Sequence, residues 1–294
     1  MRANLLLLLA AAIWGFAFVA QRVGMEYLGP FTFNGIRFAL GSLSLLPLIW
    51  HYRNQLQIPS EHNTPLPSVR MGFWAGLILF AAASLQQIGL IYTTAGKAAF
   101  ITCLYIVLVP ITGLFLRHRI ALSTWSGCLL ALIGLYFLCV KENFTISYGD
   151  LLVVIGAFFW TAHILFIDHV SRRVSTLKLA SAQFATCSVL SLVVAVLFES
   201  ASLPNILQAA IPILYGGFGS VGVAYTLQII GQKNASPAHA AIILSMETVF
   251  AAFGGFLILG ELLGLRELSG CILMLGGMLL SQMQNFKNQE EKSS

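Results

Sequence analysis

Long apolar runs alternate along the chain with short segments that hold most of its charged residues and prolines. About 20 apolar residues cross the hydrocarbon core of a bilayer as a helix. Lipid offers no hydrogen-bonding partner to a backbone amide, so each run is predicted to be a helix and not an open strand. The pattern predicts an all-α polytopic membrane protein with ten transmembrane helices, at residues 4–24, 31–50, 71–93, 97–116, 122–140, 149–169, 178–198, 210–231, 237–259 and 268–286.

The composition agrees with a chain that lies mostly in lipid. Hydrophobic residues make up 58% of it, charged residues make up 9%, and the mean hydropathy is +0.85. Soluble domains are about 25% charged, so this chain cannot cover a water-facing surface. The first run, with Arg2 and the segment 5–9, also resembles a signal peptide. It continues unbroken through residues 13–20, and we predict that it is retained as a helix.

Other features of the composition argue against several classes of protein. The five cysteines all lie inside predicted helices and none has C-x-x-C spacing, which indicates packing residues and not a disulfide framework or a metal site. The net charge of +5 comes from basic residues dispersed over loops, so no nucleic-acid partner is predicted. The sequence contains no phosphate-binding loop and no H-E-x-x-H or G-x-S-x-G motif, so no cofactor, metal or catalytic residue is predicted.

Basic residues determine the predicted orientation. With a cytoplasmic N-terminus, eleven Lys and Arg residues fall in inner segments and four in outer segments, while Arg37 lies inside a helix. Cytoplasmic loops of membrane proteins carry this excess. We therefore predict an integral protein of the plasma (inner) membrane with both termini in the cytoplasm. The proline-containing loop at 51–70 and the polar tail at 287–294 would also be cytoplasmic.

The two halves of the chain resemble each other. Pairs that match in the same order are Trp14 with Trp160, Phe38 with Phe184, Gln87 with Gln228, and Ser126 with Ser269. Each half holds five predicted helices, an odd number, so the second half enters the membrane from the opposite face. We therefore predict two inverted repeats, at 3–140 and 148–286. Secondary transporters use this plan, with the substrate site near the midplane between the halves.

Three segments carry a resemblance to a known family. They are AAIWGFAFVAQ near the start, the second helix with Pro30, Asn34, Arg37 and Phe38, and SMETVFAAFGGFLILGELL late in the chain. Over residues 3–285 the chain resembles EamA-type members of the drug/metabolite transporter superfamily. The resemblance implies ten helices in two five-helix repeats and the transport of small metabolites, often outward.

The late motif departs from the family pattern, which usually reads Leu-Glu-Pro-Val and ends in Gly-Glu. Here it reads Met246-Glu247-Thr248-Val249 and ends in Gly260-Glu261. The first-half counterpart covers residues 104–107 and ends in His118-Arg119. The proline is missing from both, which removes the sequence signal for a helix kink at either place.

Glu247 lies near the predicted midplane of the run at 237–259. A carboxylate there costs about 3 kcal/mol on insertion scales and usually marks a functional or paired site. Three interpretations remain open: a protonatable coupling group, since burial favours the neutral carboxyl; a direct partner of a substrate amine; or an ion-pair partner of Arg37. The matching residue of the first half is Tyr105, so the two halves differ chemically here.

Arg37 is the second charged candidate. Asn34, Arg37, Gly41 and Ser44 recur at helical spacing and so share one face of their helix. Arg37 either binds an anionic group, such as a substrate carboxylate, or is structural and snorkels to the outer interface about 9 Å away. Gln183 matches Arg37 by repeat position and has the same two interpretations.

The remaining candidates are polar or aromatic. Gln87 and Gln228 can bind a polar metabolite or join helices by hydrogen bonds. Trp14 and Trp160 lie in the middle of helices, where they either wall a cavity or pack. His163 lies one turn after Trp160 and is either a relay group or, as is more common for a lone histidine, a packing residue.

Together these features predict a secondary transporter that exports a small metabolite, such as an amino acid, by alternating access. Protons are a possible second partner, and export rests on the resemblance alone. The alternative is an intramembrane enzyme that acts on a lipid, although its usual cluster of Asp, His or Arg at an interface is missing. A membrane scaffold without transport would tolerate apolar replacement of the midplane polar residues. We predict that the chain is not an enzyme.

Overall fold

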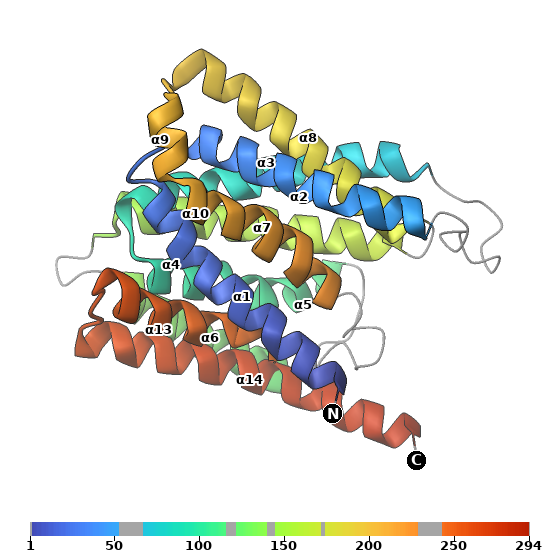
Figure 1. Cartoon of the computed structure of the whole chain (residues 1–294). Helices are drawn as coiled ribbons and strands as arrows, with labels where there is room; N and C mark the ends of the chain where they lie inside the picture. The colour runs from blue at the N-terminus through green and yellow to red at the C-terminus, as the bar shows by residue number, and fades with distance from the viewer. Residues whose placement is uncertain are drawn as a thin grey trace.

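The protein is a bundle of helices that lie side by side, with both termini at the same end (Figure 1). The computed structural model describes residues 2–52, 67–115, 122–139, 145–171, 174–228 and 243–293. All its regular elements in these ranges are helical: α1 (Arg2–Gly24), α2 (Pro30–His51), α3 (Ser68–Tyr92), α4 (Ala95–Thr102), α5 (Tyr105–Phe115), α6 (Leu122–Cys139), α7 (Tyr148–Ser171), α8 (Thr176–Phe198), α9 (Leu203–Gln208), α10 (Ala210–Leu214), the π-helix η1 (Tyr215–Ala224), α13 (Glu247–Leu259) and α14 (Leu265–Ser293).

The helices agree with the apolar pattern of the sequence. By length and composition, six described stretches can cross a membrane: Ala3–Gly24, Pro30–His51, Ser68–Tyr92, Tyr148–Ile167, Leu177–Phe198 and Ala210–Gln228. Shorter apolar helices lie at Ala95–Val109, Trp125–Leu138 and Ile243–Leu259. The prediction of an all-helical polytopic membrane protein is confirmed. Most of the predicted loop at 51–70 lies outside the described residues.

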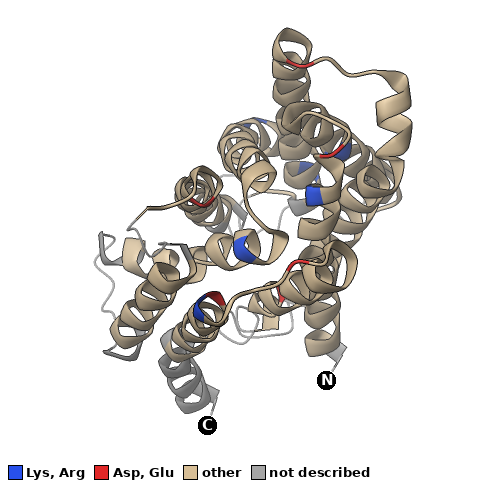
Figure 2. Cartoon of the chain, turned by 90° about the vertical axis from the view of Figure 1, so that its left-hand side faces the viewer, with Lys and Arg blue, Asp and Glu red and all other residues tan. Residues whose placement is uncertain are grey.

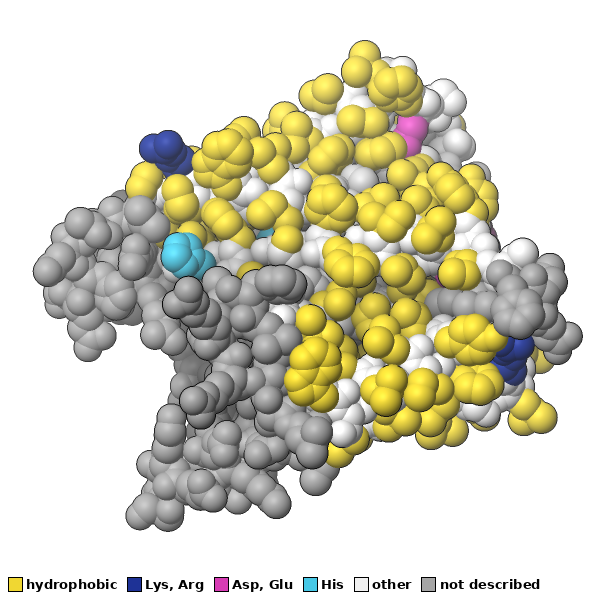
Figure 3. Space-filling view, turned by 180° about the vertical axis from the view of Figure 1, so that it is seen from behind, with side chains coloured by type: hydrophobic (Ala, Val, Ile, Leu, Met, Phe, Trp, Pro, Cys, Tyr) yellow, Lys and Arg dark blue, Asp and Glu magenta, His cyan; other side chains and the backbone are white. Residues whose placement is uncertain are grey.

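The outer surface of the bundle is apolar. Val196 is 83% exposed and Phe198 is 80% exposed, and many other large hydrophobic side chains face outward. Figure 3 shows one face on which hydrophobic side chains cover the centre, while the charged and histidine side chains lie toward its two ends. An apolar surface of this extent marks contact with lipid and not with water.

Two predicted transmembrane segments are interrupted inside the bundle. The segment predicted at 97–116 is divided into α4 and α5, because Leu104 N–H bonds to Ile101 O (3.1 Å) and Ile106 N–H to Cys103 O (3.0 Å) in tighter three-residue steps. In the second half, Met246 N–H bonds to Ile243 O at 3.2 Å, and α13 begins at the next residue. Both breaks form although neither segment has the family's proline.

Glycines bring several helices into backbone contact. A Cβ atom added to Gly217 of η1 would lie 2.7 Å from Leu40 Cβ on α2, and one added to Gly222 would lie 2.7 Å from Ser44 Oγ. Small residues at such contacts are typical of helix packing in membranes, where close approach replaces the hydrophobic effect. The contact of η1 with α2 also places the face of α2 that carries Arg37 inside the bundle.

The pair α6 and α14 allows a matched test of this packing. A Cβ atom at Gly277 would lie 2.5 Å from Gly127 O, whereas at neighbouring Gly276 the nearest atom is 3.7 Å away, on Leu130. We expect Gly277→Ala to destabilise the protein by about 1–3 kcal/mol, because it forces the helices apart. Gly276→Ala should be neutral or stabilising, because alanine favours the helix by up to about 1 kcal/mol.

The measurement is the midpoint of thermal unfolding of both variants in the same detergent. Equal midpoints for Gly277→Ala and Gly276→Ala would contradict the close approach of α6 and α14.

Candidate functional site

Glu247 lies where the two interrupted segments meet. It is the first residue of α13 and is 5% exposed. Its Oε1 atom accepts hydrogen bonds from Cys103 Sγ at 2.9 Å and from Tyr105 Oη at 3.3 Å. Cys103 lies in the break between α4 and α5, and Tyr105 is the first residue of α5. Tyr105 and Glu247, which match by repeat position, are therefore in direct contact.

This arrangement follows from the chemistry of the bilayer interior. Irregular backbone at membrane depth is tolerated only where protein buries it or where it lines a cavity. A carboxylate at a helix N-terminus is also favoured by the helix dipole. In secondary transporters, interrupted helices of this kind form the substrate and ion sites. The meeting point of the two breaks is therefore the centre of the candidate site.

Arg37 forms a second buried polar group, on α2. Its Nε donates to Asn34 Oδ1 at 2.9 Å, and Asn34 Nδ2 donates to Ala83 O on α3 at 3.2 Å. The guanidinium carbon lies 4.5 Å from the centre of the Phe38 ring, in the range of a cation–π contact. Arg37 is 4% exposed, so it does not snorkel to an interface in this structure.

The two buried charges do not pair with each other. The ion pairs within 4.0 Å among the described residues join Lys97 to Asp150 and to Glu267. The interpretation of Glu247 as the ion-pair partner of Arg37 therefore does not hold in this structure. The Tyr225 ring lies 5.2 Å from that of Phe184, which stacks on the Phe38 ring that Arg37 contacts.

Gln86, which the sequence analysis did not single out, joins α3 to three other helices. Its Oε1 accepts from Trp160 Nε1 at 2.9 Å and from Thr102 Oγ1 at 3.5 Å. Its Nε2 donates to Gln21 Oε1 at 3.2 Å. The predicted neighbour, Gln87, donates to Gln21 O at 3.2 Å, and its own Oε1 has no hydrogen-bond partner among the described residues.

His163 and Gln183 form a separate pair. His163 Nε2 and Gln183 Oε1 lie 2.8 Å apart, and the rings of His163 and Trp160 are in edge-to-face contact at 5.9 Å. The expected shared face of Trp160 and His163 is therefore present. Because Gln183 occupies one ring nitrogen of His163, the arrangement favours the packing interpretation over a relay.

The remaining candidates lie around this centre. Trp14 Nε1 donates to Ser220 O of η1 at 3.1 Å, and its ring lies 5.1 Å from that of Tyr225. A π-helix is rare and often occurs at functional sites, which adds weight to this region. Gln228 is half-buried, and no hydrogen bond connects it to another described residue.

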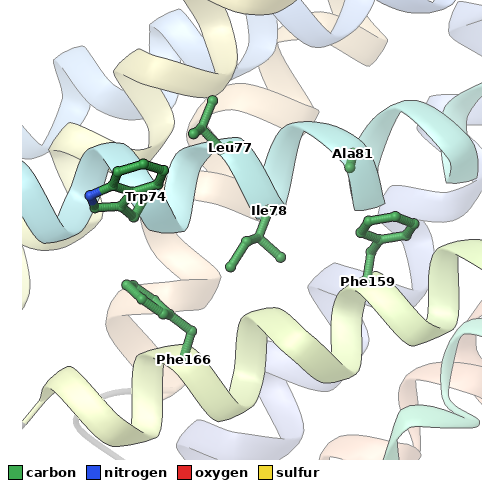
Figure 4. Close-up of a pocket in the computed structure, with 6 residues that line it drawn as sticks. All are labelled: Trp74, Leu77, Ile78, Ala81, Phe159 and Phe166. Carbon is green, nitrogen blue, oxygen red and sulfur yellow. The ribbon is translucent and has the colours of Figure 1, made fainter.

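An apolar hollow lies apart from these polar residues. It has a volume of about 370 Å³ and lies between α3 and α7 (Figure 4), lined by Trp74, Leu77, Ile78, Ala81, Phe159 and Phe166. Trp74 and Phe159 are exposed on the outer surface of the bundle. The hollow therefore suits lipid chains and not a polar metabolite.

Comparisons with known proteins agree with this architecture. The model of the EamA-like transporter family matches residues 1–140 and 147–283. An uncharacterized transporter of Archaeoglobus fulgidus is 32% identical over 96% of this chain and 86% of its own length. The uncharacterized transporter YoaV of Bacillus subtilis is 25% identical over 92% of both chains. A crystal structure at 18% identity superposes with a TM-score of 0.69 over 96% of both chains, which supports the fold alone.

The adjacent glutamines provide a matched test of the polar network. We expect Gln86→Leu to lower the free energy of unfolding by about 1 kcal/mol, because it leaves Trp160 Nε1 and Gln21 Oε1 without partners. Gln87→Leu should lower the free energy of unfolding by less. It removes only one hydrogen bond, and it also removes Oε1, a buried acceptor that has no described partner. Thermal unfolding midpoints in detergent compare the two variants. A larger loss in Gln87→Leu than in Gln86→Leu would contradict this account.

Proposed function

Because the chain belongs to the EamA-like transporter family, we propose that it is a secondary transporter that moves a small zwitterionic metabolite, such as an amino acid, outward by alternating access. Membership of the family agrees with the resemblance of the sequence, and the names of the relatives favour a transporter over an intramembrane enzyme. The proposal includes ten transmembrane helices in two inverted repeats, at 3–140 and 148–286, with both termini in the cytoplasm.

One observation carries the choice of substrate class. Arg37 and Glu247 are both buried, and neither has an oppositely charged side chain within 4.0 Å among the described residues. A buried charge without a partner is costly in a bilayer. A zwitterion supplies a carboxylate for Arg37 and an ammonium group for Glu247, and so satisfies both charges together.

The surroundings of the two charges suit such a ligand. Tyr225, which is connected to Arg37 through the rings of Phe184 and Phe38, can donate or accept a hydrogen bond. Trp14 and Trp160 are half-buried beside this region and offer apolar rings for the rest of the molecule. Glu247 also serves as the group that takes up a proton when the ammonium group leaves, which couples transport to protons.

The substrate can be identified from cells that overexpress the wild-type chain or Glu247→Gln. We expect mass spectrometry of the spent medium to show an amino acid or a related zwitterion that is enriched only with the wild type. In proteoliposomes, Arg37→Gln should weaken binding of that compound about tenfold or more, because a hydrogen bond between charged groups contributes about 1.5–3 kcal/mol.

The matched control for Arg37→Gln is a ligand that lacks the carboxylate. The amide of the same compound should bind the wild type and Arg37→Gln about equally. If Arg37→Gln weakened binding of the amide as much as that of the zwitterion, direct binding of the carboxylate by Arg37 would be wrong.

Proton coupling makes a separate prediction. In Glu247→Gln proteoliposomes, we expect an imposed pH gradient to drive no accumulation, because the side chain cannot take up or release a proton. Glu26→Gln, at an exposed residue far along the chain from this site, is the control and should behave like the wild type. The measurement is uptake of labelled substrate with and without the gradient. Gradient-driven uptake that survives in Glu247→Gln would exclude coupling through this carboxylate.

A further inference from the structure

Glu199 caps a helix that belongs to the other half of the chain. It follows the last residue of α8, and its carboxylate accepts from the backbone N–H groups of Phe31 and Thr32 at 2.9 and 2.7 Å. It also accepts from Thr32 Oγ1 at 2.7 Å. The N-cap residue of α2 is Gly29, which has no side chain to do this. The first turn of α2 therefore depends on a carboxylate from α8.

Glu261 makes the corresponding contact with α4. Gly260 has a φ of 64°, a left-handed conformation that ends α13 and turns the chain. The next residue, Glu261, then accepts from the backbone N–H of Ala95 at 2.9 and 3.0 Å and approaches that of Gly96 at 3.4 Å. This contact gives a physical role to the Gly-Glu pair that closes the late motif.

Each carboxylate occupies a space that a glycine leaves open. A Cβ atom on Gly29 would lie 2.2 Å from Glu199 Cδ, and one on Gly255 would lie 2.4 Å from Glu261 Oε2. An alanine at either position would displace the carboxylate from its helix. Two independent features of the sequence, an acid and a glycine, are thus combined in each contact.

Both contacts lie at one end of the bundle, which Figure 2 views directly. Lys97, on the capped helix α4, binds Asp150 of α7 at 3.3 Å and Glu267 of α14 at 3.1 Å at the same end. A hollow of about 360 Å³ reaches Glu261 there. Thr102, which donates a hydrogen bond to Gln86 in the polar network, lies seven residues after Ala95 on α4. At 1.5 Å per residue it is therefore about 10 Å deeper in the bundle than the capped end of that helix.

In the match between the two halves of the sequence, basic residues stand at the positions of these two acids. At an offset of 146 residues Glu199 matches Arg53, and at the offset of 142 residues that relates the late motif to its counterpart Glu261 matches Arg119. Both arginines lie outside the described residues. A guanidinium only donates hydrogen bonds, so it cannot satisfy the N–H groups of a helix N-terminus. An arginine at either matching position therefore lacks the acceptor that such a cap needs.

We propose that Glu199 and Glu261 are the two latches of a gate at this end of the bundle, which the distribution of basic residues places outside. In this structure each latch ties a helix of the first half to the second half. The site around Glu247 opens to this side when both carboxylates leave the N-termini of α2 and α4. The proposal rests on the proposed transporter function. It adds the residues that hold the transporter in one of its two alternating-access conformations, the one that is closed on this side.

The test measures access to the interior and not transport. Thr102→Cys is introduced into a chain whose five native cysteines are replaced by serine, and a membrane-impermeant maleimide is added to intact cells. We expect Glu199→Gln combined with Glu261→Gln to raise the labelling rate about tenfold, the factor that corresponds to loss of one hydrogen bond to a charged acceptor. Glu26→Gln, an exposed acid at the same end, should leave the rate unchanged.

A second pair of variants tests the latches without altering the acids. Gly29→Ala combined with Gly255→Ala should raise the labelling rate in the same direction, whereas Gly264→Ala, with no atom closer than 3.8 Å, should not. Unchanged labelling in both double variants would overturn the proposal. Faster labelling in a chain that moves no metabolite would support the gate and count against the transporter function, so the two failures are distinguishable.

Discussion

Contact between Glu247 and the break in the other half is the interaction on which the interior of this protein depends. Lipid offers nothing to a carboxylate or to unpaired backbone groups, so a helix can be interrupted at membrane depth only where protein supplies the partners. Cys103 and Tyr105 supply two of them to Glu247. The polar side chains at the two interruptions are therefore partners of one another, and this contact joins the two halves of the chain at one point.

Close packing around that point follows from the same constraint. Between helices in lipid there is little hydrophobic driving force, so association depends on contact area and on hydrogen bonds. Gly217 and Gly222 let the π-helix lie against α2, and the Trp14 ring adds a hydrogen bond to Ser220 O on the other side of that helix. The polar residues are enclosed because small residues allow the backbones to approach.

The apolar pattern of the sequence predicts the helices well, because a run of about 20 apolar residues is long enough to cross a bilayer as a helix and seldom has another structure. Helical spacing also predicts correctly that Trp160 and His163 share a face. It does not distinguish Gln86 from Gln87, because adjacent residues point about 100° apart and the rotation of α3 depends on packing. The breaks at Cys103 and Met246 are not predicted, because the family's proline is missing there and no other feature of the sequence marks the change to three-residue hydrogen bonds.

The contacts of Glu199 and Glu261 with helix N-termini could not be predicted from the sequence. Glu199 and Glu261 stand just after apolar runs, where an acid normally faces water, and their partners lie more than 160 residues away in the chain. Only the folded arrangement brings them to helix N-termini. The matches between the two halves of the sequence pair residues of different chemistry: tyrosine with Glu247, glutamine with Arg37, and arginine with Glu199 and Glu261. Under the proposed inverted repeat, these differences make the two ends of the bundle unequal, and the proposed gate requires such an inequality.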